Sequence, residues 1–151
     1  MQLFEHILVP TDGSELSRAT AERAIVIAAS MKARLTFFHA KPERRQSFFG
    51  GEGGAFVDQM PAEEFERLSE KMARDYLTTL EALAREAGVA SACVIGSAGT
   101  PFEGIIDTAN AGGCDLIIMA SHGRKGIKRL LLGSETQHVL AQATVPVLVL
   151  R

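Results

Sequence analysis

The chain has only two cysteines among its 151 residues, no long hydrophobic run and no excess of positive charge. Cys93 and Cys114 each lie inside a short apolar run, which favours two reduced, buried thiols over a disulfide or a metal pair. No apolar run approaches the roughly 18 residues that span a bilayer. The formal net charge of −2 argues against a general nucleic-acid-binding protein, because such proteins usually carry a basic domain.

Targeting signals are also missing from the first residues. "MQLFEHILVP" has no basic first segment, and it carries Glu5 and His6 where a signal peptide would be apolar. These features predict a cytoplasmic protein that binds neither membranes nor nucleic acids. The length, with 46% hydrophobic and 23% charged residues, predicts one globular domain over residues 1–151.

Short apolar segments alternate with segments of helical periodicity along the whole sequence. Five apolar strands separated by helices predict an α/β fold, in which helices cover both faces of a parallel sheet. The expected strands are His6–Pro10, Leu35–Ala40, Ala90–Gly96, Cys114–Ala120 and Val145–Leu150.

Local signals mark the ends of the expected helices. Ser14 is a plausible N-cap for a helix that runs to about Ala33. Pro61 begins a long helix that Gly88 ends. "TPFE" predicts a capping box of Thr100 and Glu103 for the next helix, and the last helix runs from about Ser134 to Ala143. The buried stripe of the long helix is expected to contain Phe65, Leu68, Met72, Tyr76, Leu80, Leu83 and Ala87.

The segment Lys41–Met60 contains four glycines and no clean period, which predicts a flexible loop. Loops of this length are often functional or disordered. Its phenylalanines Phe48, Phe49 and Phe56 fit a hydrophobic lid or an interface patch. They fit equally well a variable insertion whose aromatic rings lie against the surface.

The last expected strand, Val145–Leu150, is apolar on both faces although it ends the chain. Such a strand often lies at a sheet edge, where exposed apolar backbone promotes aggregation. Either a neighbouring element or a second subunit must therefore cover it. We expect a homodimer formed along this strand.

Two of the expected strands are followed by polar, glycine-containing segments, "PTDGS" after the first and "ASHG" after the fourth. Ligands of open α/β sheets bind beyond the carboxyl ends of the strands, where the strand order reverses. If the first and fourth strands are neighbours, both segments border the same crevice.

The stretch "MASHGRKGIKRLLLGS" combines features that a phosphate site requires. Gly123 and Gly126 permit close backbone approach, and Gly133-Ser134 begins a helix whose amides can face an anion. The additional positive charges are Arg124, Lys125, Lys128 and Arg129. The same residues also fit an ordinary capping box of Ser134 with Gln137 beside a solvated basic face. The fingerprints GxxxxGK[ST] and GxGxxG are both absent.

Histidines offer weaker candidates for chemistry. His39 and His122 lie at the ends of expected strands, where each is a candidate for an acid–base pair with Asp12. No histidine has metal-ligand spacing with the cysteines. No residue is assigned as catalytic, because nothing in the sequence supplies a dedicated base to activate water.

Three segments together resemble the universal stress protein family of the single-domain type: "ILVPTDGSELS", "ASHGRKGIKRLLLGS" and "PVLVL". The resemblance covers nearly the whole chain. ATP-binding members of the family carry the motif G-x2-G-x9-G-[ST]. The motif aligns here as Ala120-x2-Gly123-x9-Gly133-Ser134, with alanine in place of the first glycine.

The resemblance implies a Rossmann-like sheet of strand order 3-2-1-4-5, a homodimer through the fifth strand and an ATP-binding regulatory role with little or no hydrolysis. Any Mg²⁺ would bind through the phosphates. The alternative is a homologue that binds no nucleotide and serves as a protein-interaction module. The implied site begins with Pro10, Thr11, Asp12, Ala40, Met119 and Ala120 around the adenosine. Around the phosphates it implies Gly123, Arg124, Gly133, Ser134, Glu135 and Thr136.

Overall fold

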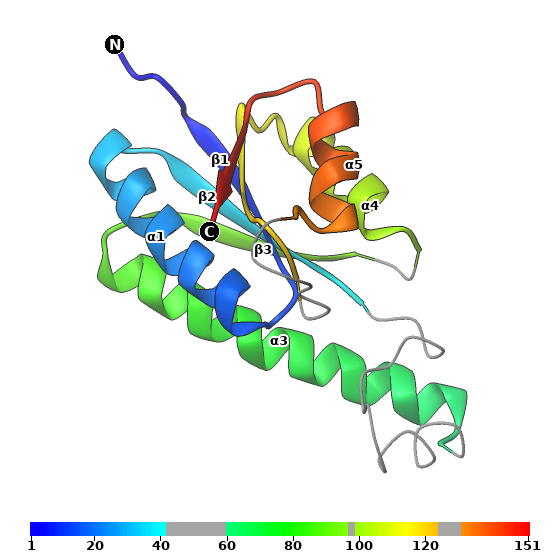
Figure 1. The fold of residues 1–151 in the computed structure, drawn as a ribbon. Coiled ribbons are helices and arrows are strands. Elements are labelled where there is room, and N and C mark those ends of the chain that lie inside the picture. Colours follow the sequence, from blue (N-terminus) through cyan, green and yellow to red (C-terminus); the bar gives the residue numbers. More distant parts are fainter. Residues whose placement is uncertain (42–59, 97–98, 124–130) are drawn as a thin grey trace.

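The computed structural model describes residues 1–41, 60–96, 99–123 and 131–151, and strands alternate with helices along them (Figure 1). The expected loop residues 42–59 lie outside this description. The strands are β1 (His6–Thr11), β2 (Arg34–Ala40), β3 (Ser91–Gly96), β4 (Leu116–Ala120) and β5 (Val147–Leu150). The helices are α1 (Glu15–Met31), α3 (Ala62–Glu86), α4 (Pro101–Gly112) and α5 (Ser134–Gln142).

The five strands form one parallel sheet of order β3-β2-β1-β4-β5, which confirms the predicted fold and strand order. β1 lies at the centre, between β2 and β4. Its register places Ile7 opposite Leu35 on one side and opposite Leu116 on the other. The carboxyl ends of β1 and β4 therefore lie side by side.

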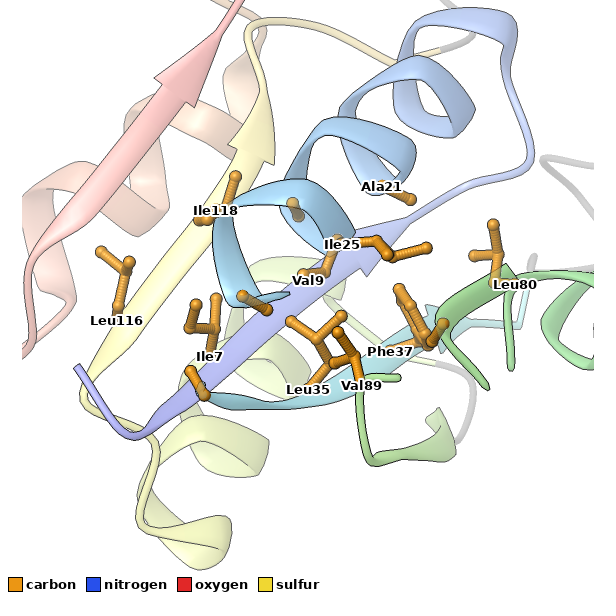
Figure 2. Packing of buried hydrophobic residues seen from close by; sticks show 14 of the residues in the cluster. Ile7, Val9, Ala21, Ile25, Leu35, Phe37, Leu80, Val89, Leu116 and Ile118 are labelled. Carbon is orange, nitrogen blue, oxygen red and sulfur yellow. The ribbon is translucent and has the colours of Figure 1, made fainter. Parts of the chain in front are cut away.

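Two helix layers enclose the sheet, with α1 and α3 on one face and α4 and α5 on the other (Figure 1). Because successive strand residues point to opposite faces, alternate residues of β1 enter different cores. Ile7 and Val9 pack beneath α1, together with Leu35 and Phe37 of β2 and with Leu80 of α3 (Figure 2). Leu8 belongs to the second core, which α4 and α5 cover and which also contains Phe38, Ile117 and Met119.

The predicted stripe of α3 is partly wrong. Phe65 and Leu80 are buried as expected, but the most deeply buried side chains between them are Ala73 and Leu77. Met72 is 53% exposed. The predicted stripe and the observed stripe both recur at the helical period, but they lie on different faces of α3. The observed face carries Ala73 and Ala84, whose small side chains let the helix approach the sheet.

The local signals place the ends of α1 and α3 close to the predicted positions. Ser14 caps α1 through a hydrogen bond from the Ser17 amide to its Oγ (3.2 Å), and Gly88, at φ 73°, follows the end of α3. Pro61 is the N-cap residue of α3, one position before the helix begins. The predicted Thr100 capping box is wrong, because the Thr100 side chain makes no capping hydrogen bond.

β5 lies at one edge of the sheet, as predicted, and β3 lies at the other. Leu150 is buried under α1, whereas Leu148 is 39% exposed. The two cysteines are free. Cys114 is buried and Cys93 half-buried, and β2 and β1 separate them in the sheet. No helix among the described residues is long and apolar enough to span a membrane.

His6, at the amino end of β1, contacts the amino-terminal part of β2 and the carboxyl end of α4. Its side chain is 8% exposed, its Nδ1 lies 3.0 Å from the Gly112 carbonyl oxygen and its Nε2 lies 2.8 Å from Thr36 Oγ1. The carbonyl can only accept, so Nδ1 carries the proton and a neutral ring accepts from Thr36 through Nε2. Burial, and secondarily the positive charge of Arg34, lower the pKa of His6.

Because the pKa of His6 is lowered, we expect the folded protein to become less stable as the pH decreases. The folded protein resists protonation of His6, whereas the unfolded chain takes up a proton near the ordinary pKa of 6.5. The contribution of His6 is complete above that value and is lost as the pH falls from 6.5 toward the lower folded pKa. Urea unfolding between about pH 7 and pH 5 should therefore show a falling free energy of unfolding.

The matched variants are His6→Asn, whose amide can still donate to Gly112, and His138→Asn, which removes an exposed histidine. We expect His6→Asn to flatten the pH dependence and His138→Asn to retain it. An unchanged slope in His6→Asn would assign the dependence to other groups.

Candidate functional site

The turn after β1 is held by its own side chains. Asp12 Oδ1 accepts a hydrogen bond from the Ser14 amide (2.9 Å), and Gly13 adopts a φ of 80° that glycine tolerates without strain. Ser14 in turn caps α1. This turn therefore presents Asp12 and the amino end of α1 at the carboxyl edge of the sheet.

The segment after β4 lies directly against this turn. A Cβ atom added to Gly123 would collide with the Asp12 carboxylate. A side chain at position 123 would force the Asp12 carboxylate to move, because Asp12 Oδ2 fills the space that a Cβ atom would need. The predicted proximity of the two segments is therefore confirmed, and it also gives Gly123 a structural reason to be glycine.

The amino end of α5 joins the same cluster. The Gly133 amide donates to the Ser121 carbonyl (2.8 Å), and a Cβ on Gly133 would lie 3.2 Å from His122 Cα. Thr136 is buried, and its Oγ1 donates to the Ala120 carbonyl (3.0 Å). These contacts fasten the first turn of α5 to the end of β4 and to the segment that follows it.

The amino end of α5 follows Gly133, which is the N-cap residue of the helix. The first intrahelical bond runs from the Gln137 amide to the Gly133 carbonyl, and no side chain of the described residues caps the helix. Ser134 begins the helix and is exposed. The alternative capping box of Ser134 with Gln137 is wrong, because the Gln137 side chain donates to the Leu132 carbonyl instead (2.7 Å). Such a helix terminus attracts anions.

Glu135 has a structural partner in the other helix of its layer. Its Oε2 accepts a hydrogen bond from the Phe102 amide (2.7 Å), so it caps α4 in place of Thr100. The rings of Phe102 and His138 lie alongside, with centroids 4.5 Å apart. The hydrogen bond from Phe102 explains why the acidic Glu135 lies beside a predicted phosphate position, because the carboxylate of Glu135 is directed at the amino end of α4.

The other residues implied by the resemblance lie along the same edge, mostly buried. Pro10 and Thr11 end β1, and Met119 and Ala120 end β4. Met119 packs in the core under α4 and α5, and strand alternation puts the Ala120 methyl on the opposite face, with Ile118. Half-buried Ala40 ends β2. Arg124, with Lys125, Gly126, Lys128 and Arg129, lies outside the described residues.

The histidine candidates have neighbours of their own. His39 lies against Tyr76, with ring centroids 6.2 Å apart, and His122 Nδ1 lies 3.1 Å from Ser121 Oγ. Among the described residues, no group of three or more histidine, cysteine or carboxylate side chains is arranged to hold a metal ion.

The sequence reasoning missed two side chains that contact the site. Thr11 Oγ1 lies 3.0 Å from Ser17 Oγ and 2.7 Å from the Tyr76 hydroxyl. Ser17 is buried on α1, and no sequence motif marks it as a contact of the site. Tyr76 was assigned to the hydrophobic stripe of α3, and nothing local indicates that its hydroxyl reaches β1.

A parallel sheet between two helix layers, with glycine-containing segments gathered at its switch point, defines a doubly wound α/β protein. The model of the universal stress protein family matches residues 3–151. The chain therefore belongs to this family.

One relative illustrates the match both in sequence and in structure. Universal stress protein MJ0577 from Methanocaldococcus jannaschii is 30% identical, over 99% of this chain and 96% of its own. The solved structure of MJ0577 has a TM-score of 0.79, at 28% identity over 98% and 96% of the two chains.

Two more distant structures share the fold. One is a universal stress protein in complex with cAMP, with a TM-score of 0.65 at 23% identity over 98% and 97% of the chains. The other is the universal stress protein from Archaeoglobus fulgidus in complex with dAMP, with a TM-score of 0.63 at 13% identity over 100% of both chains.

The contact between Gly123 and Asp12 predicts a coupled pair of substitutions. Gly123→Ala should lower the free energy of unfolding by about 0.5–1 kcal/mol, because the new methyl displaces the Asp12 carboxylate from its contacts. In an Asp12→Ala background the same change should cost much less. Chemical unfolding of the four proteins of this cycle measures the coupling.

Gly99→Ala is the control, because nothing lies within 4 Å of a Cβ at Gly99. It should leave stability within about 0.5 kcal/mol of the parent. Additive costs for Gly123→Ala and Asp12→Ala would contradict the contact.

The capping role of Glu135 predicts a loss of stability on truncation. Glu135→Ala should lower the free energy of unfolding by about 1 kcal/mol, because the Phe102 amide loses a charged acceptor. The control is Glu103→Ala, which removes one negative charge from the first turn of α4 but leaves the capping hydrogen bond of Glu135 in place. Equal effects of the two substitutions in urea unfolding would contradict the role of Glu135.

Proposed function

We propose that this chain is an adenine-nucleotide-binding regulatory protein of the stress response. ATP is the proposed nucleotide, with any Mg²⁺ held through its phosphate oxygens. The observation that carries the proposal is the convergence of Asp12, Gly123 and the amino end of α5 at one edge of the sheet. Membership of the universal stress protein family supports the regulatory role.

The chemistry of the cluster suits a nucleotide with its phosphates toward α5. The first turn of α5, which no side chain of the described residues caps, offers backbone amides and the exposed Ser134 hydroxyl, and these groups favour an anion. The Asp12 carboxylate beside them is an acceptor for the hydroxyls of a ribose. The family relatives in complex with cAMP and dAMP support an adenine nucleotide as the class of ligand.

Binding without rapid turnover is the proposed mode of action. A nucleotide held by α5 and by the turns after β1 and β4 would join elements of both helix layers. It would therefore favour the arrangement in which those turns are ordered, as expected for a population shift. We propose little or no hydrolysis, a cytoplasmic location and a homodimer formed along Val145–Leu150, where β5 exposes the sheet edge.

The substitution Ser134→Glu separates phosphate binding from folding. An acidic residue in the first turn of a helix stabilises it by about 0.3–1 kcal/mol, so the fold should be retained or strengthened. The same charge repels phosphates. Calorimetry should therefore show micromolar ATP binding by the parent, an ATP affinity at least about tenfold weaker in Ser134→Glu, and unchanged adenosine affinity.

The control is Gly99→Ala, which should bind ATP as the parent does. An unchanged ATP affinity in Ser134→Glu would place the phosphates away from α5. A parent that binds neither ATP nor adenosine, yet remains an intact dimer, would favour the alternative of an interaction module, for which Ala120 in place of the motif glycine leaves room.

A further inference from the structure

We propose that Tyr76, on α3, is a positioning residue for the nucleotide site, acting through Thr11 and Ser17 on the turn that carries Asp12. The inference rests on the function proposed above. It extends the site to a helix that contributes none of the residues of the family motif and to a side chain 65 positions from Thr11.

The hydrogen bonds around Thr11 have a defined direction. Ser17 Oγ lies 3.1 Å from the Ser14 carbonyl, which can only accept, so the Ser17 hydroxyl proton is committed there. The proton between Thr11 and Ser17 must then come from Thr11. The Thr11 oxygen consequently accepts from the Tyr76 hydroxyl, at 2.7 Å. The hydrogen bonds therefore form a series in which Tyr76 donates to Thr11, Thr11 donates to Ser17, and Ser17 donates to the Ser14 carbonyl.

This series of hydrogen bonds ends on the turn after β1, which carries Asp12. Ser17 Oγ also accepts from the Asp12 amide at 3.4 Å, and the Ser14 amide donates to Asp12 Oδ1. Thr11 and Ser17 are 6% and 3% exposed, so water cannot readily replace a missing partner. Hydrogen bonds in series strengthen one another, and removal of the first donor therefore weakens the whole chain.

Tyr76 also contacts the end of the neighbouring strand. Its ring lies against His39, with the ring planes inclined at 55°. His39 precedes Ala40, one of the positions that the family resemblance implies around the adenosine. One side chain of α3 thus touches the carboxyl ends of both β1 and β2, two of the three strands that carry those positions.

The test compares two hydroxyl deletions on the same helix. Tyr76→Phe removes only the hydroxyl that begins the chain. Thr79→Val removes an exposed hydroxyl whose partner is the Asp75 carbonyl of its own helix. Calorimetry well below the unfolding temperature should show an ATP affinity about three- to tenfold weaker for Tyr76→Phe and an unchanged affinity for Thr79→Val.

A second readout follows from the composition, since Tyr76 is the one tyrosine of the sequence. Protein labelled with 3-fluorotyrosine should give a single ¹⁹F resonance from position 76. Addition of ATP should shift this resonance along a curve that saturates with the calorimetric affinity. A purely structural tyrosine would change the unfolding temperature on substitution without showing either effect.

The outcomes separate the two proposals. If the parent binds ATP but Tyr76→Phe binds it equally well, the positioning role is overturned and the nucleotide site stands. An ATP-insensitive ¹⁹F resonance in a parent that binds ATP has the same meaning. If the parent binds no nucleotide, the proposed function fails and the role of Tyr76 fails with it.

Discussion

The parallel pairing of β1 with both β2 and β4 is the constraint on which the rest of the molecule depends. Because all three strands run in the same direction, every segment that leaves them emerges at one edge of the sheet. Ile7, Leu8 and Val9 are fully buried and enter different cores in alternation. A one-residue slip would exchange the two cores, so burial holds the register and with it the relative height of Asp12 and Gly123.

The edge of the sheet is assembled from contacts that cross between layers. α1 begins at the turn after β1, α5 is fastened to the end of β4, and α3 reaches β1 through the Tyr76 hydroxyl. Each of these contacts satisfies a polar group that would otherwise be buried without a partner. The candidate site is therefore made of backbone and hydroxyl groups held by both helix layers, and no single loop forms it alone.

Helix termini show how far local rules extend. Ser14 caps α1 as its sequence context predicts, since the donor lies three residues away. At α4 the local signal "TPFE" is present, yet the acceptor is Glu135 on another helix, 33 residues from Phe102. A local motif competes with any acceptor that packing brings close, and α4 and α5 pack against each other.

The sequence by itself determined the alternation of strands and helices, the two-faced burial of the sheet and the family, because periodicity and short motifs depend on neighbours in the chain. The resemblance to the family added the strand order and named Asp12, Gly123, Gly133 and Ser134, all of which lie at one edge of the sheet. Only the tertiary structure decided that Gly123 makes room for Asp12, that Glu135 serves α4 and that Tyr76 holds Thr11. These contacts join residues from different elements, and their partners are selected by packing distance, which no local pattern encodes.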